Sequence, residues 1–450
     1  MRILLVTYYF PPAGGGGVQR VLSWCRHLAQ LGCEVTVVAP DEPHWVDHDT
    51  TLVIPNGTTV LRTPDPSPEA VIPMRALAEV QGVRRLLRRI ALQPRRFAVP
   101  DIHRRWRGPA LAAIRSEAAR RRQAGEPGWD VVISSSPPET THVIAHDASK
   151  ELGIPWVADY RDSWLDLPHL RMDSALVRAK HRRNVRLATR LMHDAAAATT
   201  VSEPLAQDLR TRHPHLDVHV LENGIEPTDV SRAHARASGF RDSGKFVVTY
   251  TGNFFGQQSA SRIIEAIEDA TSRFPALRDD LLVKFVGGLK PHELARATSG
   301  ALGAVVEHEP FLRHDDVLAT QKAADLLLFY VAPGRGSRGV YTGKVFEYVM
   351  SRRPVLAQSP DDNVATELLR RSGQLAAGGG AHVDSGDEFD QDGELTADAL
   401  VRAWQLWIDA GGRDGGQVPD IDVPADVLAS IDRATTARRL HELLQVVVAR

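Results

Sequence analysis

Short apolar runs alternate along this chain with longer segments in which apolar residues recur at helical spacing. In the first half, runs at residues 3–7, 34–39, 131–134 and 156–159 predict strands. The segment between the first two runs has helical periodicity and stops at Gly32, a residue typical of helix ends. A strand, a helix and a second strand make a βαβ unit, which requires a parallel sheet with right-handed crossovers.

The same alternation restarts after a polar stretch at residues 222–243. Further strands are predicted within KFVVTYTG (245–252), LLVKFVGG (281–288), AVVEHEPF (304–311), DLLLFYV (325–331) and RRPVLAQ (352–358), and a helix within 259–275. We therefore expect an α/β protein with two doubly wound, Rossmann-like domains, an N-terminal domain at 1–225 and a C-terminal domain at 240–433. The last periodic segment, 434–450, predicts a helix that crosses back to the first domain.

The composition agrees with this organisation. A chain of 450 residues exceeds what one hydrophobic core usually organises. Its formal net charge of −2 does not favour nucleic acid as a partner, and its two cysteines are too few for a disulfide framework or a metal cluster. The N-terminal apolar run is typical of a strand and not of a signal peptide, and no window approaches about 18 uninterrupted apolar residues. We expect a cytoplasmic protein.

Charge is concentrated in a few segments. Residues 84–122 and 178–190 are strongly basic. They are either solvated faces of helices or a surface for an anionic acceptor or lipid headgroups, and the second alternative would bring the protein to the inner face of the plasma membrane. The acidic segment 384–394 predicts a surface loop, and its spacing does not fit a calcium-binding EF-hand.

Ligands of doubly wound domains bind off the carboxyl ends of the strands, so the residues directly after each strand are candidates. In PPAGGGGVQR (11–20), glycines would let a ligand approach the backbone, and a helix N-terminus would favour an anion. This segment lacks the third glycine of the dinucleotide-binding G-x-G-x-x-G motif, and a flexible loop without function is an equal alternative. In YTGNFFGQQSAS (250–261), backbone amides near Asn253 could meet a diphosphate.

Two polar segments also follow strands of the first half. DVVISSSPPETTH (130–142) places serines at a strand end, where they suit sugar or phosphate contacts or simply begin the next helix. PWVADYRDSW (155–164) crowds Asp159, Arg161 and Asp162 at the end of an apolar strand. Three charges at such a strand end indicate either a ligand or a structural Arg–Asp network.

The remaining candidate segment is RGVYTGKVFEYVMSRRPVLAQ (338–358). A loop ends at Lys344 and runs into a short amphipathic helix, where Glu347 stands on the first turn among apolar residues. A carboxylate in this position can accept hydrogen bonds from two hydroxyl groups of a ligand.

These segments, taken in order, resemble a known family. The glycine-rich loop after the first strand, PWVADYRDSW, VSEPLAQDL, LENGIE, TYTGNF, FVGG and GKVFEYVMSRRPVLA resemble the retaining glycosyltransferases of family 4 (group 1) over nearly the whole chain. FAVPDIHRRW, PWVADYRDSW and TGKVFEY are similar to the bacterial polysaccharide-type branch. The resemblance implies the GT-B fold, in which two Rossmann-like domains face each other across a cleft, the acceptor side on the first and the nucleotide-sugar donor mostly on the second.

The resemblance also implies roles for individual residues. Glu347 would accept hydrogen bonds from the ribose hydroxyls of the donor, and Lys344 would offset its diphosphate charge. The other donor-binding residues implied are Gly16, Gly17, Asn253, Tyr341, Thr342 and Gly343. The donor would be a nucleotide-sugar such as a UDP-, GDP- or dTDP-sugar, with no cofactor and no metal.

The sequence departs from the family pattern in both domains. The first of two family glutamates would fall at Gly339. An Arg and a Lys that commonly hold the diphosphate are replaced by Asn253 and by Gln257 or Gln258, and Arg335 and Arg338 are candidates to compensate. In the first domain, a His or an acid that the family often uses has its nearest match at Ser135 and Ser136. Asp162 and Arg161 are therefore the candidates for catalysis on the acceptor side.

The expected activity is transfer of a sugar to an acceptor hydroxyl with retention of configuration, in the biosynthesis of a polysaccharide or a glycosylated natural product. The acceptor would be a lipid-linked saccharide or a small molecule. A sugar-nucleotide epimerase or hydrolase on the same fold, and a non-catalytic nucleotide-sugar-binding protein, remain alternatives. A dehydrogenase is disfavoured because no dinucleotide fingerprint follows a strand.

Overall fold

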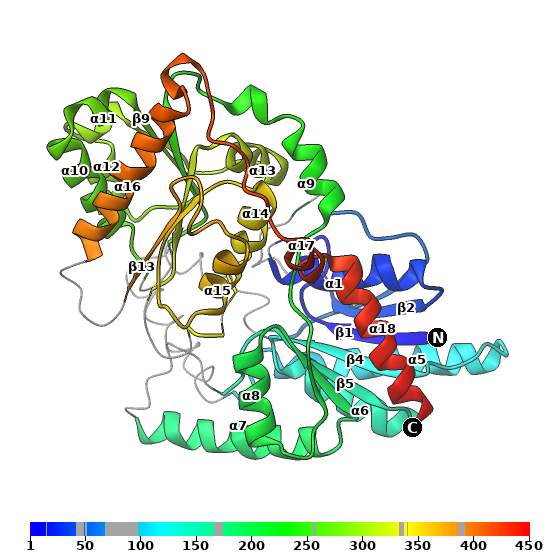
Figure 1. Cartoon of the computed structure of the whole chain (residues 1–450). Helices are drawn as coiled ribbons and strands as arrows, with labels where there is room; N and C mark the ends of the chain where they lie inside the picture. The colour runs from blue at the N-terminus through cyan, green and yellow to red at the C-terminus, as the bar shows by residue number, and fades with distance from the viewer. Residues whose placement is uncertain are drawn as a thin grey trace. The chain divides into compact units, whose positions relative to one another are not determined.

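Figure 1 shows a computed structural model of the chain. The residues that the structure describes are 1–14, 16–41, 49, 52–67, 98–165, 174–254, 258–332, 337–339, 341–385 and 392–450. They form two compact units: unit 1 comprises Met1–Asn223 and Arg433–Arg450, and unit 2 comprises Gly224–Asp432.

Unit 1 is built on a parallel sheet whose described strands lie in the order β3-β2-β1-β4-β5-β6-β7. The strands are β1 (Arg2–Thr7), β2 (Glu34–Pro40), β3 (Thr58–Thr63), β4 (Val131–Ser136), β5 (Trp156–Tyr160), β6 (Ala197–Thr200) and β7 (Val218–Val220). β1, β4 and β5 are buried almost throughout, as expected for parallel strands covered on both faces.

Helices cover both faces of this sheet. They are α1 (Gly16–Gln30), η2 (Arg104–Trp106), α5 (Arg107–Gln123), α6 (Thr140–Leu152), α7 (Ala175–His193), α8 (Glu203–Arg212) and α18 (Arg433–Ala449). Ile3 and Leu5 of β1 belong to the core under α1 and α18, and Leu4 and Val6 to the core under α5, α6, α7 and α8. The last helix, α18, packs along α1 (Figure 1).

Unit 2 repeats this plan with the described strands in the order β10-β9-β8-β11-β12-β13, all parallel. The strands are β8 (Phe246–Thr251), β9 (Leu281–Val286), β10 (Val306–Glu309), β11 (Leu326–Tyr330), β12 (Val355–Ser359) and β13 (Ala381–Asp384). The α/β class with two doubly wound parallel sheets, expected from the sequence, is thereby confirmed.

The helices of unit 2 form two layers around its sheet. They are α9 (Pro227–His234), η3 (Ala237–Phe240), α10 (Ser261–Arg273), α11 (Pro275–Asp280), α12 (Pro291–Ala297), η4 (Leu302–Ala304), α13 (His314–Ala323), α14 (Lys344–Ser351), α15 (Val364–Arg371), α16 (Asp392–Asp409), η5 (Gly412–Asp414) and α17 (Ala425–Ser430). The α10 and α16 side chains pack on one face, and those of α14 and α15 pack on the other.

The strand orders fix where ligands should bind. In unit 1 the chain leaves β1 towards β2 and later returns to β4 on the other side of β1; in unit 2 it does the same with β8, β9 and β11. Such reversals open a crevice at the carboxyl ends of the two strands concerned. The loops after β1 and β4, and after β8 and β11, are therefore the places to look for a site.

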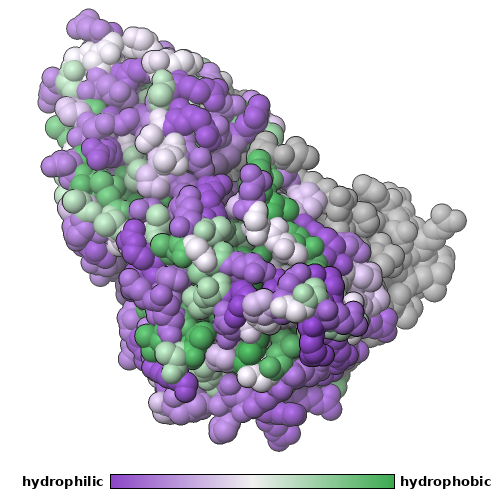
Figure 2. Space-filling view, turned by 90° about the vertical axis from the view of Figure 1, so that its right-hand side faces the viewer, coloured by the Kyte–Doolittle hydropathy of each residue, from purple (hydrophilic) through white to green (hydrophobic). Residues whose placement is uncertain are grey.

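The face in Figure 2 is largely hydrophilic, and its hydrophobic residues are interrupted by polar ones. Within the described parts of the chain, no helix combines the length and the apolar character needed to cross a bilayer.

Candidate functional site

Glu347 lies on the first turn of α14, directly after the loop that follows β11. The helix forms here because Val345, Phe346 and Val349 bury one face, and it ends where Arg352 adopts a left-handed conformation two residues before a proline. Glu347 points away from this buried face and keeps 18% of its side chain exposed. A carboxylate is thus fixed to a rigid element beside the β8–β11 reversal.

The carboxylate of Glu347 is oriented by a glutamine. Gln321 of α13 donates from Nε2 to Glu347 Oε2 at 2.8 Å and to Thr251 Oγ1 at 2.9 Å. His314, at the start of α13, places Nδ1 3.9 Å from Glu347 Oε1 and is 57% exposed. One carboxylate oxygen is therefore anchored by the protein, and the other faces a more open environment. Sequence reasoning missed Gln321 and His314, which belong to a helix between two predicted strands.

Lys344 precedes Glu347 by three residues and lies over an aromatic ring. Its Nζ donates to Tyr250 Oη at 2.7 Å and is 3.9 Å from the centre of that ring. Burial lowers the pKa of Lys344 to about 7, and the negative charge of Glu347 opposes this shift. At neutral pH the ammonium is thus only partly charged, and an anion bound beside it would favour the protonated form.

The glycine-rich turns after β8 and β9 are packed too closely for side chains. Gly252 has φ +123°, and a Cβ there would lie 3.2 Å from Lys344 Nζ; a Cβ on Gly287 would lie 2.2 Å from the carbonyl oxygen of Gly252. Asn253 accepts a hydrogen bond at Oδ1 from the backbone N–H of Gly288. Asn253 therefore joins two turns, and its exposed side chain lies at the carboxyl end of β8.

The three residues before α14 differ in their surroundings. Tyr341 packs its ring 5.2 Å from that of Phe346. Thr342 accepts from the N–H of Val345 at its carbonyl oxygen, and its buried Oγ1 meets no hydrogen-bond partner in the described structure. Gly343 is exposed, and no atom lies within 4 Å of where its Cβ would be. Its backbone is thus open to a ligand.

The positions where the sequence departs from the family pattern, and the two arginines that could compensate, are only partly described. Arg338 is exposed and pairs with Asp362 at 2.8 Å, Gly339 is buried, and Gln258 is half-buried. Arg335 and Gln257 lie outside the described residues.

In unit 1, Arg161 joins three loops at the reversal between β1 and β4. Its Nε donates to the Ser136 carbonyl at 2.9 Å, one terminal nitrogen donates to the Pro137 carbonyl at 2.7 Å, and the other donates to the Gly17 carbonyl. A Cβ on Gly17 would lie 2.6 Å from the guanidinium, so the glycine permits this approach. Gly16 begins α1. The loop after β1 thus has a defined structural partner.

Asp159 belongs to a buried polar network. Arg20 of α1 pairs with it at 2.8 Å, while Ser135 and Thr199 donate to its carboxylate at 2.8 and 2.7 Å. The network connects α1 with β4, β5 and β6. For the PWVADYRDSW segment, the sequence left open either a ligand or a structural Arg–Asp network. Asp159 belongs to such a network, but its partner Arg20 comes from a different segment.

Asp162 lies just beyond, and its side chain reaches the surface. The surrounding protein raises the pKa of Asp162, and the charge of Arg161 opposes this shift. Glu139, the first residue after the Ser-Ser-Ser-Pro-Pro run, is half-buried in the same part of unit 1, and burial followed by the charge of Asp101 raises its pKa to about 8. Sequence reasoning did not single out Glu139, although its position three residues after the end of β4 was a usable signal.

The structure describes all of the second basic segment but only part of the first. Residues 84–97 lie outside the described part, as does most of the acidic segment 384–394. α7 carries the second basic segment and contains no acidic residue; Arg182, Arg186 and Arg190 follow at four-residue spacing and are exposed.

Comparison with known proteins shows what the first half of the chain is similar to. Residues 15–224 match the family model described as a glycosyl transferase 4-like domain. This match covers just under half of the chain and supports a family 4-type glycosyltransferase. The matched segment spans nearly all of the N-terminal part of unit 1, including the loops that Arg161 joins, and the fold expected from the resemblance, GT-B, agrees with it.

Solved structures support this fold for the whole chain. Sucrose-phosphate synthase from Thermosynechococcus elongatus is similar with a TM-score of 0.59 and 16% identity, over 100% of this chain and 99% of that one. Trehalose 6-phosphate synthase from Burkholderia multivorans gives 0.58 and 14%, with the same coverages. UDP-GlcNAc 2-epimerase from Methanocaldococcus jannaschii gives 0.52 and 11%, over 99% of this chain and 100% of that one. No curated protein matches the sequence.

Proposed function

We propose that this glycosyltransferase moves a hexose from a nucleotide-sugar to an acceptor hydroxyl with retention of the anomeric configuration, in the biosynthesis of a polysaccharide or a glycosylated natural product. The observation that carries the proposal is the carboxylate of Glu347, anchored by Gln321 at the β8–β11 reversal of unit 2. A carboxylate held in this way can accept two hydroxyl groups of a ribose, with little loss of side-chain entropy on binding.

The diphosphate of the donor is assigned to the same edge of the sheet. Lys344 supplies a cation whose charge increases when the anion arrives. The exposed backbone of Gly343 directly precedes α14, whose N-terminus favours negative charge. These groups would stabilise the leaving diphosphate as its bond to the sugar breaks. Attack by the acceptor from the same face then gives retention, and the departing phosphate oxygen takes the acceptor proton.

The acceptor is assigned to unit 1, where Asp162 is the candidate to orient its hydroxyl group. Burial by the surrounding protein raises the pKa of Asp162, which disfavours the charged carboxylate, and an approaching hydroxyl would stabilise that charge by donating a hydrogen bond. Arg161 is a positioning residue, because its guanidinium holds the loops after β1 and β4 against the segment that carries Asp162.

The exposed arginines of α7 suit an anionic lipid surface, which would bring the enzyme to a lipid-linked acceptor at the cytoplasmic face of the membrane. Their four-residue spacing places several cations on one side of a helix, where each contributes about 1 kcal/mol of attraction to an anionic bilayer. Leu176, which is 60% exposed at the start of α7, adds an apolar contact. Co-sedimentation with vesicles rich in phosphatidylglycerol tests this, and binding unchanged by the joint replacement of Arg182 and Arg186 with Gln would overturn it.

The activity is tested by incubating the full chain with UDP-, GDP- and dTDP-hexoses and panels of saccharide and small-molecule acceptors. Product formation and the anomeric coupling constant by NMR are the readouts. An axial product linkage from an axial donor supports the proposal. Free sugar or an epimerised nucleotide-sugar, formed without acceptor, would instead indicate a hydrolase or an epimerase.

A further inference from the structure

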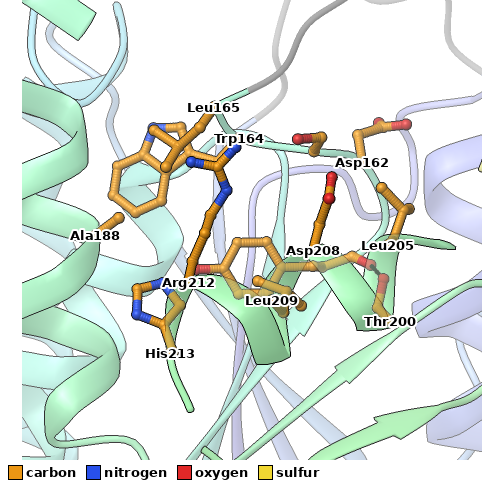
Figure 3. Close-up of a pocket in the computed structure, with 12 residues that line it drawn as sticks. Asp162, Trp164, Leu165, Ala188, Thr200, Leu205, Asp208, Leu209, Arg212 and His213 are labelled. Atoms are coloured by element: carbon orange, nitrogen blue, oxygen red, sulfur yellow. Dashed lines mark hydrogen bonds between the residues drawn. The ribbon is translucent and has the colours of Figure 1, made fainter. Parts of the chain in front are cut away.

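A cavity lies in unit 1 off the carboxyl ends of β5 and β6, between the segment 161–165 and helices α7 and α8 (Figure 3). Its lining includes Asp162, Trp164, Asp208, Arg212 and His213. The space that the centre of a water molecule can occupy measures about 30 Å³. This is room for one or two small groups, so the cavity fits part of a larger molecule that extends to the surface.

Two of the lining residues have buried polar atoms with unmet hydrogen-bonding capacity. Trp164 is 6% exposed and His213 is 3% exposed. The indole Nε1 of Trp164 and the imidazole Nδ1 of His213 find no hydrogen-bond partner among the described residues. Buried polar atoms in folded proteins are normally paired, and two exceptions around one cavity point to a polar occupant.

The other end of the cavity is acidic. Figure 3 shows Trp164, Arg212 and His213 at one end and Asp162 and Asp208 at the other, with the Asp208 carboxylate directed from α8 towards the segment that carries Asp162. Both carboxylates belong to exposed residues, and the described structure gives neither of them an ion-pair partner within 4 Å. The cavity thus offers carboxylate acceptors at one end. At the other end it offers the indole N–H of Trp164 beside Arg212 and His213.

Carboxylates at one end and hydrogen-bond donors at the other limit the class of ligand that the cavity can bind. An anion would suit the indole N–H and Arg212, but two carboxylates would repel it. An ammonium group would suit the carboxylates but cannot accept from the indole N–H. A neutral polyol satisfies both ends, because each hydroxyl group donates and accepts, and the C–H face of a sugar ring packs on aromatic side chains.

We infer that this cavity is a saccharide subsite, which takes a hydroxyl or hydroxymethyl group of a neutral sugar between Trp164 and the pair Asp162 and Asp208. Its role as part of the acceptor site rests on the proposed function. Asp162 follows Arg161 directly, so a sugar in the cavity is adjacent to the loops that Arg161 joins at the β1–β4 reversal. The subsite thereby selects acceptors that carry a sugar next to the reacting hydroxyl.

The test is ¹⁹F NMR of the full chain labelled with 5-fluorotryptophan, with the Trp164 signal assigned by Trp164→Phe. The probes are the methyl glycosides of glucose, galactose, mannose and N-acetylglucosamine. We expect at least one of them to shift the Trp164 signal saturably. We expect Asp208→Asn to weaken this binding about tenfold, because a charge-assisted hydrogen bond is replaced by a neutral one. Glu203→Gln, at the start of α8 and outside the cavity, is the matched control.

A Trp164 signal that none of the glycosides moves would overturn the inference. So would a shift that Asp208→Asn leaves unchanged, or that Glu203→Gln reduces equally. Nucleotide binding to the same labelled chain, monitored separately with Glu347→Ala, keeps the two proposals apart. Glycoside binding without nucleotide binding upholds the subsite and contradicts the proposed transferase; nucleotide binding without glycoside binding does the reverse.

Discussion

The side-chain amide of Gln321 donates a 2.8 Å hydrogen bond to the carboxylate of Glu347. The two residues are 26 positions apart and belong to different helices, so this bond joins α13 to α14. The same amide nitrogen also donates to Thr251 at the end of β8. The carboxylate assigned to the donor ribose is therefore held in place before any ligand arrives, which lowers the entropic cost of binding.

Gln321 should consequently affect donor affinity without touching the donor. We expect Gln321→Met, which keeps the length of the side chain but removes the amide, to weaken nucleotide binding by about 0.5–1.5 kcal/mol, the net value of one hydrogen bond. Isothermal titration calorimetry measures the change. Gln405→Met, at an exposed position of α16, is the control, and equal effects of the two substitutions would argue against a positioning role.

The lowered pKa of Lys344 predicts that donor affinity depends on pH. Its pKa is about 7 in the unliganded protein, and a bound diphosphate raises it, so binding takes up a proton at pH values above 7. Affinity should then be flat below pH 7 and fall by up to about tenfold per pH unit above it. The titration uses an intact nucleotide-sugar, because a free nucleotide has a terminal phosphate that titrates near neutrality itself.

Lys344→Met should remove this slope and weaken binding most at low pH. Lys245→Met, a surface lysine of unit 2 whose Nζ donates to the Asp279 carbonyl, should keep the slope. A slope that survives in Lys344→Met would assign the proton to another group.

Alanine substitutions at Gly17 and Gly108 test how strongly Arg161 constrains the loop after β1. Each is the second residue of a helix, α1 or α5, where alanine usually stabilises by up to about 1 kcal/mol. No atom lies within 4 Å of a Cβ on Gly108, but a Cβ on Gly17 would displace the Arg161 guanidinium. We expect Gly17→Ala to lower the free energy of unfolding by about 1–3 kcal/mol relative to Gly108→Ala, measured by urea denaturation. Equal stabilities would show that Arg161 moves aside at no cost.

Replacing Asp162 distinguishes a role in acceptor binding from a role in donor binding. We expect Asp162→Asn to reduce the transfer rate by about ten- to a hundredfold while leaving nucleotide-sugar affinity near that of the unmodified protein, because the carboxylate is assigned to the acceptor hydroxyl alone. Single-turnover kinetics and calorimetry give the two quantities. Asp217→Asn, another acid of unit 1, should change neither. A collapse of donor affinity in Asp162→Asn would place this residue at the donor instead.

The sequence predicted the strands well where they contain a continuous apolar run, as in β1, β4, β8 and β11. It missed β3, β6, β7 and β13. AATT in β6 and VHV in β7 are short, and the first is made of small residues that carry little strand signal. The sequence prediction also ended β4 at Ser134, although pairing with β5 extends that strand to Ser136. The end of β4 is determined by its parallel pairing with β5. Local periodicity does not reveal pairing between segments that are distant in sequence.

For the site, the position of Glu347 could be read from local spacing, since a loop and a single helical turn determine it. The partners of that residue could not. Gln321 reaches Glu347 from another helix, and the Arg161 guanidinium reaches the Gly17 carbonyl across 144 positions. The pKa of Glu139 likewise depends on Asp101, which only the fold brings close. Charged residues after strands marked the right places, but their roles depend on contacts that are distant in sequence.

The central claim is that Glu347 binds the ribose of a nucleotide-sugar donor, and calorimetric titration of the full chain with UDP, GDP, dTDP, ADP and CMP and their common sugars tests it most directly. The account predicts that one base family binds and that Glu347→Ala weakens this binding by about 1–3 kcal/mol, the value of hydrogen bonds to a charged group. Glu367→Ala, on the first turn of α15, should leave binding unchanged. Binding of no nucleotide, or equal affinity in Glu347→Ala and the unmodified protein, would contradict the account.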